Sequence, residues 1–458
     1  MKVSILAAAG IFSTALAGPV VEKRANTISN PKTPPVSVKG NAFYTSSGSR
    51  FYIRGVDYQP GGSSANEDPI ADANGCARDV KEFQKLGINT IRVYSVDNSK
   101  DHDQCMQMLA DAGIYLALDV NTPFYSLNRK DNESIHMSYN DVYLQSVFAT
   151  VDAFAKYDNT LLFYSGNEVI NDDTNTFAAP YVKAVTRDIR AYIAARQYRS
   201  IPVGYSAADV ESNRYEMATY MNCGNDAVRS DFFAFNDYSW CDPSSFTISG
   251  WDKKVEQYSN YSIPIFLSEF GCNTNKRDFG EIAALYSDQM TPVYSGGLVY
   301  EYSEESSNYG LVNINGDSVE ELDDFAALQK AYSATPAPSG DGGAKSGSSP
   351  SQCPAQSQHW EVNDPTGNYL PIMPEGAKKY FSSGAGAGPG NNGNTGSQTA
   401  GTPSTGFAMS DGTTTSSSSS SSKAAAANVR VPEMTLAPFV AGLVVFASSL
   451  LGGAGFLF

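Results

Sequence analysis

The chain of 458 residues lacks the motifs on which several common kinds of active site depend. Its only histidines are His102, His136 and His359, and no two of them are spaced like a pair of metal ligands. The sequence contains neither a Gly-x-Ser-x-Gly nucleophile motif nor a glycine-rich loop that binds phosphate. These absences argue against hydrolysis by a metal ion or by a serine triad, and the sequence predicts no metal and no cofactor.

Positive charge is also scarce. The chain has 32 Lys and Arg against 48 Asp and Glu, a formal net charge of -16, and its basic residues form no cluster. Nucleic acids and anionic polymers bind through clustered cations, so neither is expected as a partner. Aromatic residues are abundant, with 27 Tyr and 23 Phe. Most will belong to the core, but aromatic rings in a cleft offer flat apolar faces to sugar rings. The expected substrate is neutral, polyhydroxylated and extracellular.

Short apolar runs alternate with amphipathic segments along most of the chain. A hairpin is expected first, formed by 36–39 and 51–58. The amphipathic segments include 76–86, 101–112 and 140–155, and the first two of these end at a glycine. Eight alternations of strand and helix predict an α/β fold, a (β/α)8 barrel with elaborated loops. The eight expected strands are 51–57, 88–96, 114–120, 161–164, 202–205, 232–238, 264–267 and 297–302.

Two of these apolar runs end in a glutamate. Gly166-Asn167-Glu168 follows the fourth expected strand, and Ser268-Glu269-Phe270-Gly271 follows the seventh. The carboxyl ends of barrel strands form the rim of the active site. Two carboxylates on that rim suffice to cleave a glycosidic bond, one as acid and base and the other as nucleophile. Each glutamate could instead form a structural ion pair, but their matching placement on two strands favours catalysis.

The two ends of the chain predict a secreted, lipid-anchored protein. An apolar stretch, 5–16, closes on Ala15-Leu16-Ala17, which indicates a signal peptide over 1–17. Lys23-Arg24 resembles a dibasic processing site, so 18–24 is a possible propeptide. At the other end, 436–458 is uncharged with no Lys or Arg after it, and small residues stand upstream at Ala424 to Ala427. This order is typical of a glycosylphosphatidylinositol (GPI) attachment signal over 424–458, removed on lipid attachment. The alternative is a membrane span, which usually carries basic residues on its cytoplasmic side.

The composition changes before that signal. Residues 382–422 are dominated by Gly, Ser, Thr and Asn, which cannot bury apolar surface. We therefore predict a disordered, O-glycosylated stalk over 381–423 and a catalytic barrel with a C-terminal extension over 25–380. Six cysteines in a secreted chain predict three disulfides, for which fifteen pairings exist. Cys241 and Cys272 follow neighbouring expected strands, which makes that pair plausible. Asn132 and Asn260 begin N-glycosylation sequons.

Seven stretches, in the same order, carry a family resemblance: FYIRGVDYQPGG, NTIRVYSVD, LDVNTP, SGNEVIND, FFAFNDYSWC, FLSEFGCNTNKR and GGLVYEYSEE. From Val36 to about Tyr380 the chain resembles fungal β-1,3-glucanosyltransferases of glycoside hydrolase family 72. Members are secreted, held by a glycolipid on the outer face of the plasma membrane, and remodel cell-wall glucan. Some also carry a cysteine-rich carbohydrate-binding module, but here only Cys353 lies beyond the barrel, so the short subgroup is expected.

The resemblance implies roles for individual residues. It implies Glu168 as the acid/base and Glu269 as the nucleophile, in agreement with the strand-end pattern. It implies a sugar-binding cleft lined by Tyr94, Asn167, Asp209, Arg214, Tyr238 and Tyr300, with Gln59, Asp119, Tyr302 and Tyr309 as further candidates. It also implies disulfides between Cys76 and Cys105, Cys223 and Cys353, and Cys241 and Cys272. We expect a monomer on the cell surface, partly in the wall, acting on β-1,3-glucan donor and acceptor chains.

The two glutamates by themselves leave the reaction open. A retaining double displacement forms a glycosyl-enzyme that either water or another glucan chain can attack. The first outcome is an endo-β-1,3-glucanase and the second a glucanosyltransferase, and only the family resemblance favours transfer. A non-catalytic glucan-binding protein is a further alternative. Loss of one glutamate would be its signature, and both are present.

Overall fold

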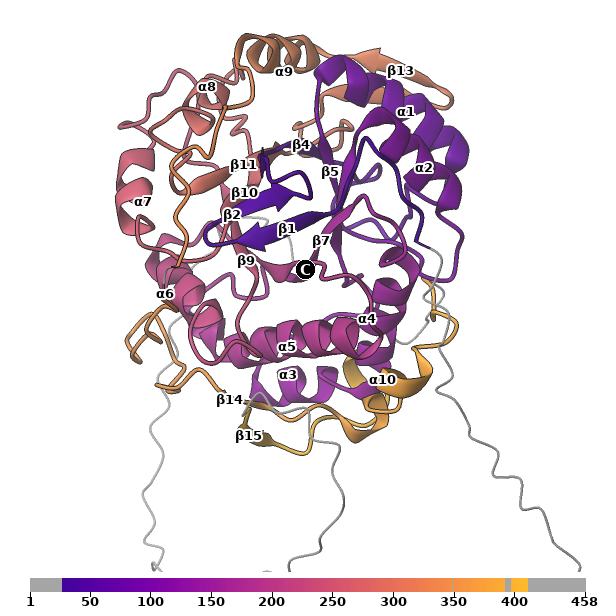
Figure 1. Cartoon of the computed structure of the whole chain (residues 1–458), viewed down its shortest axis with the longest axis vertical. Helices are drawn as coiled ribbons and strands as arrows, with labels where there is room; N and C mark the ends of the chain where they lie inside the picture. Colours follow the sequence, from indigo (N-terminus) through magenta and orange to yellow (C-terminus); the bar gives the residue numbers. More distant parts are fainter. Residues whose placement is uncertain (1–26, 348, 392–396, 411–458) are drawn as a thin grey trace, which may run out of the picture. The chain divides into compact units, whose positions relative to one another are not determined.

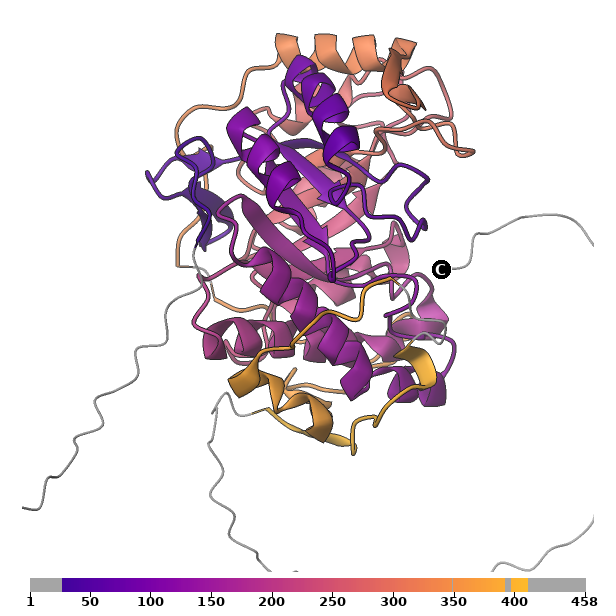
Figure 2. The ribbon, with the colours of Figure 1, turned by 90° about the vertical axis from the view of Figure 1, so that its right-hand side faces the viewer.

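The computed structural model describes residues 27–347, 349–391 and 397–410. Eight parallel strands close into a barrel in which each strand pairs with the next along the chain, and the last pairs with the first. All eight predicted strands are confirmed, and Figure 1 and Figure 2 show the barrel from two sides. The strands are β4 (Ile53–Asp57), β5 (Thr90–Val93), β6 (Tyr115–Asp119), β7 (Thr160–Asn167), β8 (Val203–Ala207), β9 (Phe232–Asp237), β10 (Ile265–Phe270) and β11 (Tyr294–Val299).

Helices surround the barrel in the order of the chain (Figure 1). The side chain of Asp72 caps the first of them, and Gly87 ends it with a φ of 71°, a left-handed conformation that glycine adopts without strain. Their apolar faces pack on the strands, which explains why the strands are buried on both sides. The helices are α1 (Ala73–Leu86), α2 (Asp103–Ala112), α3 (Asn132–Ser138), α4 (Asp141–Phe154), η1 (Asp173–Ala178), α5 (Ala179–Ala195), α6 (Glu211–Met221), α7 (Trp251–Gln257), α8 (Glu281–Leu285) and α9 (Asp323–Ala334).

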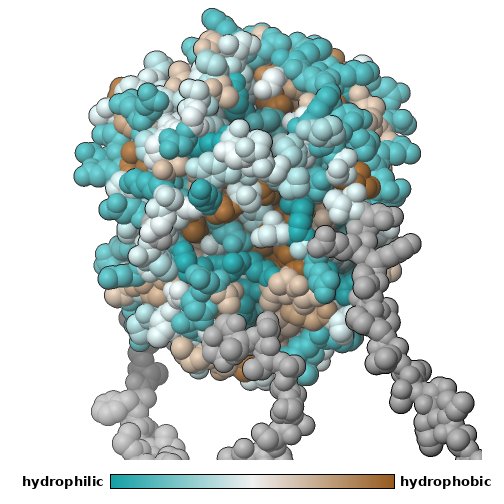
Figure 3. Space-filling model, in the orientation of Figure 1, coloured by the Kyte–Doolittle hydropathy of each residue, from teal (hydrophilic) through white to brown (hydrophobic). Residues whose placement is uncertain are grey.

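A small antiparallel sheet closes the amino-terminal end of the barrel. It consists of β1 (Val36–Lys39), β2 (Ala42–Thr45) and β3 (Arg50–Phe51). The Phe43 ring lies 6.3 Å from that of Phe232 and 6.0 Å from that of Phe266, near the starts of β9 and β10. The face carrying this sheet is mostly hydrophilic outside, with small scattered apolar patches (Figure 3). Plugging this end leaves the opposite end, where the strands finish, for a cleft.

The predicted hairpin is wrong in its pairing. The strand β1 pairs with β2 rather than with residues 51–58, because Gly40, at a φ of 59°, allows a two-residue turn directly after β1. The predicted second strand is divided in the structure. Arg50–Phe51 forms β3 against β2, and Ile53–Asp57 enters the barrel as β4.

The chain beyond the barrel wraps around its helices. A hairpin of β12 (Val312–Asn315) and β13 (Ser318–Glu321) precedes α9. Further on, β14 (Tyr369–Pro371) pairs with β15 (Phe407–Met409), and three short helices lie between them. These helices are η2 (Glu375–Ala377), α10 (Tyr380–Ser383) and η3 (Ser397–Thr399). Figure 2 shows this yellow segment against α4 and α5.

The folded region therefore continues past the boundary predicted at residue 380. Phe381 packs on Phe148 and Tyr192, with ring centroids 5.7 and 5.6 Å away, and Phe407 lies in β15. These two phenylalanines anchor the Gly- and Ser-rich segment on the helices. A composition averaged over forty residues conceals two such residues, which is why the sequence predicted a stalk here. The rest of the predicted stalk, the signal peptide, the propeptide and the GPI signal lie outside the described residues. Within the described ranges, no helix is long and apolar enough to cross a membrane.

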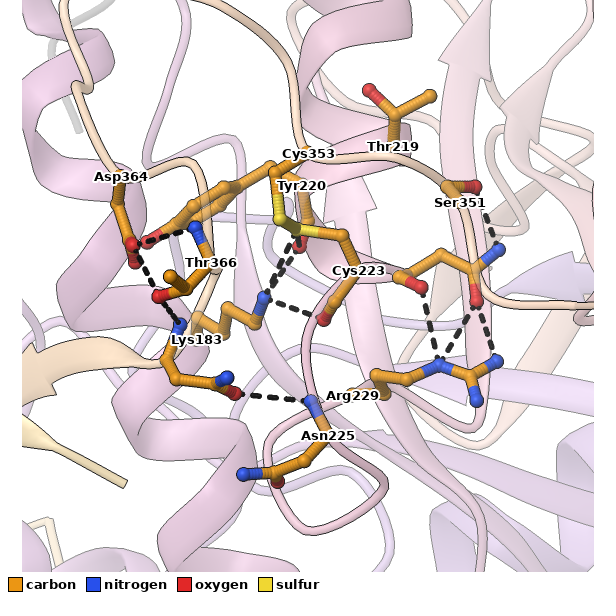
Figure 4. The surroundings of a disulfide bond; sticks show 12 residues. Lys183, Thr219, Tyr220, Cys223, Asn225, Arg229, Ser351, Cys353, Asp364 and Thr366 are labelled. Atoms are coloured by element: carbon orange, nitrogen blue, oxygen red, sulfur yellow. Dashed lines mark hydrogen bonds between the residues drawn. A yellow bond between two sulfur atoms is a disulfide. The ribbon is translucent and has the colours of Figure 1, made fainter. Parts of the chain in front are cut away.

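The structure contains the three disulfides that the family resemblance implied. Cys76–Cys105 joins α1 to α2, and Cys241–Cys272 joins the loops that follow β9 and β10. Cys223–Cys353 fastens the chain beyond the barrel to the end of α6 (Figure 4). Beside it, the fully buried Lys183 of α5 donates hydrogen bonds to the carbonyl oxygens of Tyr220 (2.7 Å) and Cys223 (2.9 Å). Burial lowers the pKa of Lys183 to about 7.

Candidate active site

The two glutamates lie at the carboxyl ends of the fourth and seventh barrel strands, as predicted. Glu168 follows β7 and Glu269 lies within the end of β10. Glu168 has a φ of 48°, an uncommon conformation for a residue other than glycine, and its backbone N–H donates to the Ser206 carbonyl oxygen at 2.9 Å. Strained backbone of this kind concentrates at functional sites. Glu168 is partly exposed, whereas Glu269 is only 7% exposed.

Three donors hold the carboxylate of Glu269. Tyr94 Oη donates to Oε1 and Tyr238 Oη to Oε2, each at 2.8 Å, and Arg92 Nη1 lies 3.3 Å from Oε1. Burial raises the pKa of Glu269 to about 7, the nearby Glu168 adds to the rise, and Arg92 and the two tyrosines oppose it. The donors also fix the rotamer of the carboxylate. Glu269 is therefore an oriented carboxyl group in a nearly dry site, and its three donors favour the ionised form that a nucleophile needs.

Arg92 is a central residue that the sequence analysis missed. Its Nε donates to Asp119 Oδ2 at 2.9 Å, and its guanidinium lies over the rings of Tyr94 (4.3 Å) and Tyr164 (4.5 Å). Arg92 is fully buried in the barrel interior. A charged residue inside the apolar run of an expected strand was the available signal. Asp119, predicted to line the cleft, contacts Arg92 and so supports Glu269 through it.

Asn236 is a second residue that the sequence analysis missed. It lies on β9 with no exposed surface, and its Nδ2 donates to Glu168 Oε1 at 2.6 Å. Its signal in the sequence was a polar residue at the end of the apolar run that begins at Phe232. On the other side of Glu168, Arg129 donates to the Glu168 carbonyl oxygen. The acid/base candidate is thus held by side chain and backbone.

Predicted aromatic residues meet on one side of the site. The rings of Tyr238, Tyr300 and Tyr309 contact one another edge to face, with centroids 5.3 to 6.4 Å apart. Asp209 lies beside them, paired with Arg214 at 2.5 Å and accepting the Tyr238 backbone N–H at 3.1 Å. This aromatic wall with charged neighbours suits a polyhydroxylated substrate, whose rings stack while its hydroxyls hydrogen-bond.

Two predicted lining residues lie elsewhere. Tyr302 is fully buried, and its hydroxyl donates to Asp79 Oδ1 of α1 at 2.9 Å. The prediction that Tyr302 lines the cleft is wrong, because its backbone pairs with Asp57 and its ring packs outward between the barrel and α1. Gln59 is 1% exposed, and its Oε1 accepts the backbone N–H groups of Tyr94 (3.2 Å) and Ser95 (3.1 Å). Gln59 therefore positions Tyr94.

Two further carboxyl groups lie buried near Glu269. Asp57 ends β4 with no exposed surface, and neither of its side-chain oxygens has a hydrogen-bond partner within the described residues. Burial raises the pKa of Asp57 well above its usual range and that of Glu301 to about 7. A protonated Asp57 avoids adding a second negative charge beside the nucleophile. In the part of the chain that the structure describes, no group of three His, Cys, Asp or Glu is arranged to hold a metal ion.

Comparison with known proteins yields one consistent group. A family profile described as "Glucanosyltransferase" matches residues 25–336. The chain is 62% identical to the 1,3-beta-glucanosyltransferase gel1 of Aspergillus fumigatus over 393 residues, covering 85% of this chain and 84% of that protein. It is 54% identical to the 1,3-beta-glucanosyltransferase GAS5 of Saccharomyces cerevisiae over 392 residues, covering 84% and 78%. Its fold matches a mutant of Saccharomyces cerevisiae Gas2p solved with laminaritetraose and laminaripentaose. That match has a TM-score of 0.68 and 39% identity, and covers 75% of this chain and 76% of the solved chain.

Proposed function

The chain belongs to the glucanosyltransferase family, glycoside hydrolase family 72, and we propose that Glu168 and Glu269 are the catalytic pair of a β-1,3-glucanosyltransferase. One observation carries the assignment: Glu269 is held at both oxygens by Tyr94 and Tyr238 above a buried Arg92. A carboxylate so oriented at the rim of a barrel is built for attack on an anomeric carbon.

The first displacement uses both glutamates. A Glu269 oxygen bonds to the anomeric carbon of an internal β-1,3-linked glucose, and the bond from that carbon to the glycosidic oxygen breaks. Protonated Glu168 gives its proton to the departing oxygen of the reducing-end fragment. The Tyr94 and Tyr238 hydroxyls, which held the Glu269 charge, stay near the new ester. Asn167, next to Glu168, is placed to hydrogen-bond the 2-hydroxyl of the attacked sugar.

The second displacement makes the enzyme a transferase. Glu168, now a carboxylate, takes the proton of an acceptor hydroxyl, whose oxygen bonds to the anomeric carbon as Glu269 leaves. When the acceptor is the 3-hydroxyl at the non-reducing end of another β-1,3-glucan, the chain grows, with its anomeric configuration retained. The aromatic wall of Tyr238, Tyr300 and Tyr309 is suited to bind an acceptor in place of water.

Product size tests transfer directly. The purified protein is incubated with a β-1,3-glucan oligosaccharide whose reducing end has been reduced, and the products are sized by mass spectrometry. Transfer yields oligosaccharides longer than the donor. Products that are only shorter would establish an endo-β-1,3-glucanase, and an unchanged donor would leave a glucan-binding protein.

The cellular location of the protein is also a proposal, and it rests on the sequence at the ends of the chain. The support is the uncharged tail over 436–458 behind the small residues at 424–427. A lipid near Ala424 to Ala427 would hold a monomeric barrel on the outer face of the plasma membrane among wall glucan. Mass spectrometry of the mature C-terminus decides the matter. A surface form that still ends at Phe458 would contradict a GPI anchor, and a lipid-modified peptide ending near residue 427 would support it.

A further inference from the structure

The amide of Asn236 is engaged at both of its ends. Nδ2 donates to Glu168 Oε1 at 2.6 Å, and Oδ1 accepts from Ser268 Oγ at 3.0 Å. Asn236 and Ser268 have no exposed surface, so water does not compete for these bonds. An amide with one acceptor and one donor as fixed neighbours has one favourable orientation.

The contacts continue beneath the site to Asn167. Ser268 Oγ lies 2.8 Å from Ser206 Oγ, and Ser206 Oγ lies 2.7 Å from Asn167 Oδ1. The chain of contacts thus begins at Glu168, crosses β9, β10 and β8, and returns to the residue that precedes Glu168. Among the described residues, Asn236 is the hydrogen-bond partner of the Glu168 carboxyl group.

We propose that Asn236 is a positioning residue for Glu168, which keeps Oε1 as a hydrogen-bond acceptor and so leaves the transferable proton on Oε2. This inference deepens the proposed function and depends on Glu168 being the acid/base. A carboxylic acid carries its proton on either oxygen with equal ease when nothing distinguishes them. The short bond from Asn236 distinguishes them, because an Oε1 that carried the proton would present an O–H to the Nδ2 donor.

Counting protons shows how the serines hold this orientation. Ser268 and Ser206 have one hydroxyl proton each, but three contacts join them to each other and to the two asparagines. One amide must therefore donate to its serine. Asn236 cannot do so while its Nδ2 serves Glu168. As placed, Ser206 Oγ donates to Asn167 Oδ1 at 2.7 Å, so supplying the missing proton requires the Asn167 amide to turn and bring its Nδ2 to Ser206.

Other charged or titratable groups also act on Glu168. Glu269 faces it from β10, Tyr205 from β8, and Arg129 from the segment before α3. None of these three contacts involves the Asn236 amide or the Ser268 hydroxyl, so changing either residue removes the amide contact and leaves the other three unaltered.

The test compares two donors that differ in their need for an acid. A laminari-oligosaccharide has a sugar leaving group that requires protonation, whereas a 2,4-dinitrophenyl β-1,3-glucan oligosaccharide has a leaving group that departs as an anion. The variants are Asn236→Ala and Ser268→Ala. Ser295→Ala is the matched control, since Ser295 is an equally buried serine of β11 whose hydroxyl has no hydrogen-bond partner among the described residues. Secretion and thermal unfolding confirm that each variant folds.

Asn236→Ala should lower kcat/KM for the laminari-oligosaccharide about tenfold to a hundredfold, the effect of losing one hydrogen bond to a charged group. On the dinitrophenyl donor the loss should be several times smaller. Ser268→Ala, which frees the amide to turn, should give a smaller loss with the same donor selectivity. Ser295→Ala should leave kcat/KM unchanged for both donors.

Equal losses on both donors would overturn the inference. If Asn236→Ala does not fold, Ser268→Ala decides alone, and wild-type behaviour of that variant would refute the role of the amide. Since kcat/KM reports the first displacement, the measured ratio between the two donors is the same whether glucan or water attacks afterwards. A failure of transfer would therefore refute the proposed function without affecting this inference.

Discussion

Single residues around the two glutamates give two chemically identical carboxyl groups different surroundings. Glu269 is buried and held by Tyr94, Tyr238 and Arg92, whereas Glu168 is partly exposed and held by an amide. An anion needs donors at both oxygens to be oriented, and an acid that must give and recover a proton needs one free oxygen. The surroundings match these different needs.

Replacing either glutamate by glutamine should abolish transfer. Glu168→Gln removes the transferable proton and should lower activity on glucan about 10²–10⁴-fold, the usual contribution of general acid catalysis. Glu269→Gln removes the nucleophile and should lower that activity at least as much. Product formation from a reduced β-1,3-glucan oligosaccharide measures the loss, with secretion and thermal unfolding as controls. Near-wild-type activity in either variant would contradict the site assignment.

Removing the hydroxyl groups that hold Glu269 should shift the acid limb of the pH profile. Both Tyr94 and Tyr238 lower the pKa of Glu269 by donating to its charged form. Tyr94→Phe and Tyr238→Phe should each raise that pKa, so activity should be lost at a higher pH than in the wild type, by about one pH unit. The pH dependence of kcat/KM measures it.

Tyr302→Phe is the matched control for these two variants. Tyr302 is also a buried tyrosine whose hydroxyl donates to a carboxylate, but its partner is Asp79 of α1. The Tyr302→Phe substitution should therefore leave the acid limb of the pH profile unchanged. An acid limb that moved equally in all three variants would point to a general loss of structure.

At the scale of elements, the strands place the site and the chain beyond the barrel stabilises it. Residues 381–391 and 397–410 cross α4 and α5. Thr402 N–H donates to Asp141 Oδ1 of α4 (2.7 Å), and Gly390 N–H donates to Asn98 Oδ1 in the loop after β5 (2.9 Å). The β14–β15 pair closes this segment against α5. A part of the chain that looks like a stalk by composition acts as a strap.

Cutting the strap should destabilise the barrel. A chain that ends at residue 380 loses Phe381 from its contact with Phe148 and Tyr192, and should melt at a lower temperature than a chain that ends at Ser410. Within the longer chain, Phe381→Ala should cost about 2 kcal/mol, less than for a fully buried phenylalanine. Equal melting temperatures for the two truncated chains would show that the strap contributes nothing.

The buried Lys183 of α5 should give stability an unusual pH dependence. Burial lowers its pKa from 10.5 to about 7 in the folded state, so between about pH 7 and 10 the unfolded chain binds more protons there than the folded chain. The wild type should therefore gain stability relative to Lys183→Met as pH rises through this window, by up to about 1.4 kcal/mol per pH unit. Urea unfolding at pH 7.5 to 9.5 measures the difference, and parallel curves for the two proteins would contradict a neutral Lys183.

For the whole molecule, the barrel sets the distance between the two glutamates. The amino-terminal sheet plugs one end through Phe43, so substrate must enter where the strands finish. Carboxyl groups on the fourth and seventh strands then face each other across the barrel mouth. The distance between them decides whether a water molecule fits opposite the leaving group.

We predict a retaining reaction. The two carboxyl groups should lie about 5 to 5.5 Å apart in a crystal structure, too close for the water that inversion requires. Proton NMR of the first products should show the β-anomer. A separation of about 8 Å, or an α-anomer formed first, would contradict the double displacement.

The sequence alone determined the barrel and pointed to Glu168 and Glu269 as its candidate catalytic pair. Strand periodicity is local, so each of the eight strands could be predicted from its own apolar run, and a strand-end glutamate needs no tertiary information to be found. The signal peptide and the lipid anchor were also inferred from local patterns, and they stay predictions. The roles of Tyr94 and Tyr238 came from matched family motifs, which already contain tertiary information.

Only the tertiary structure decided which polar residues support the pair. Arg92 and Asn236 looked like polar interruptions of apolar strands, and their partners are 177 and 68 residues away along the chain. The direction of a side chain after a strand end is also non-local, which is why Tyr300 joins the aromatic wall while Tyr302 packs on α1. The strap was hidden for the same reason, because its two phenylalanines pack on Phe148 of α4 and on Tyr192 and Tyr181 of α5, which lie far earlier in the chain.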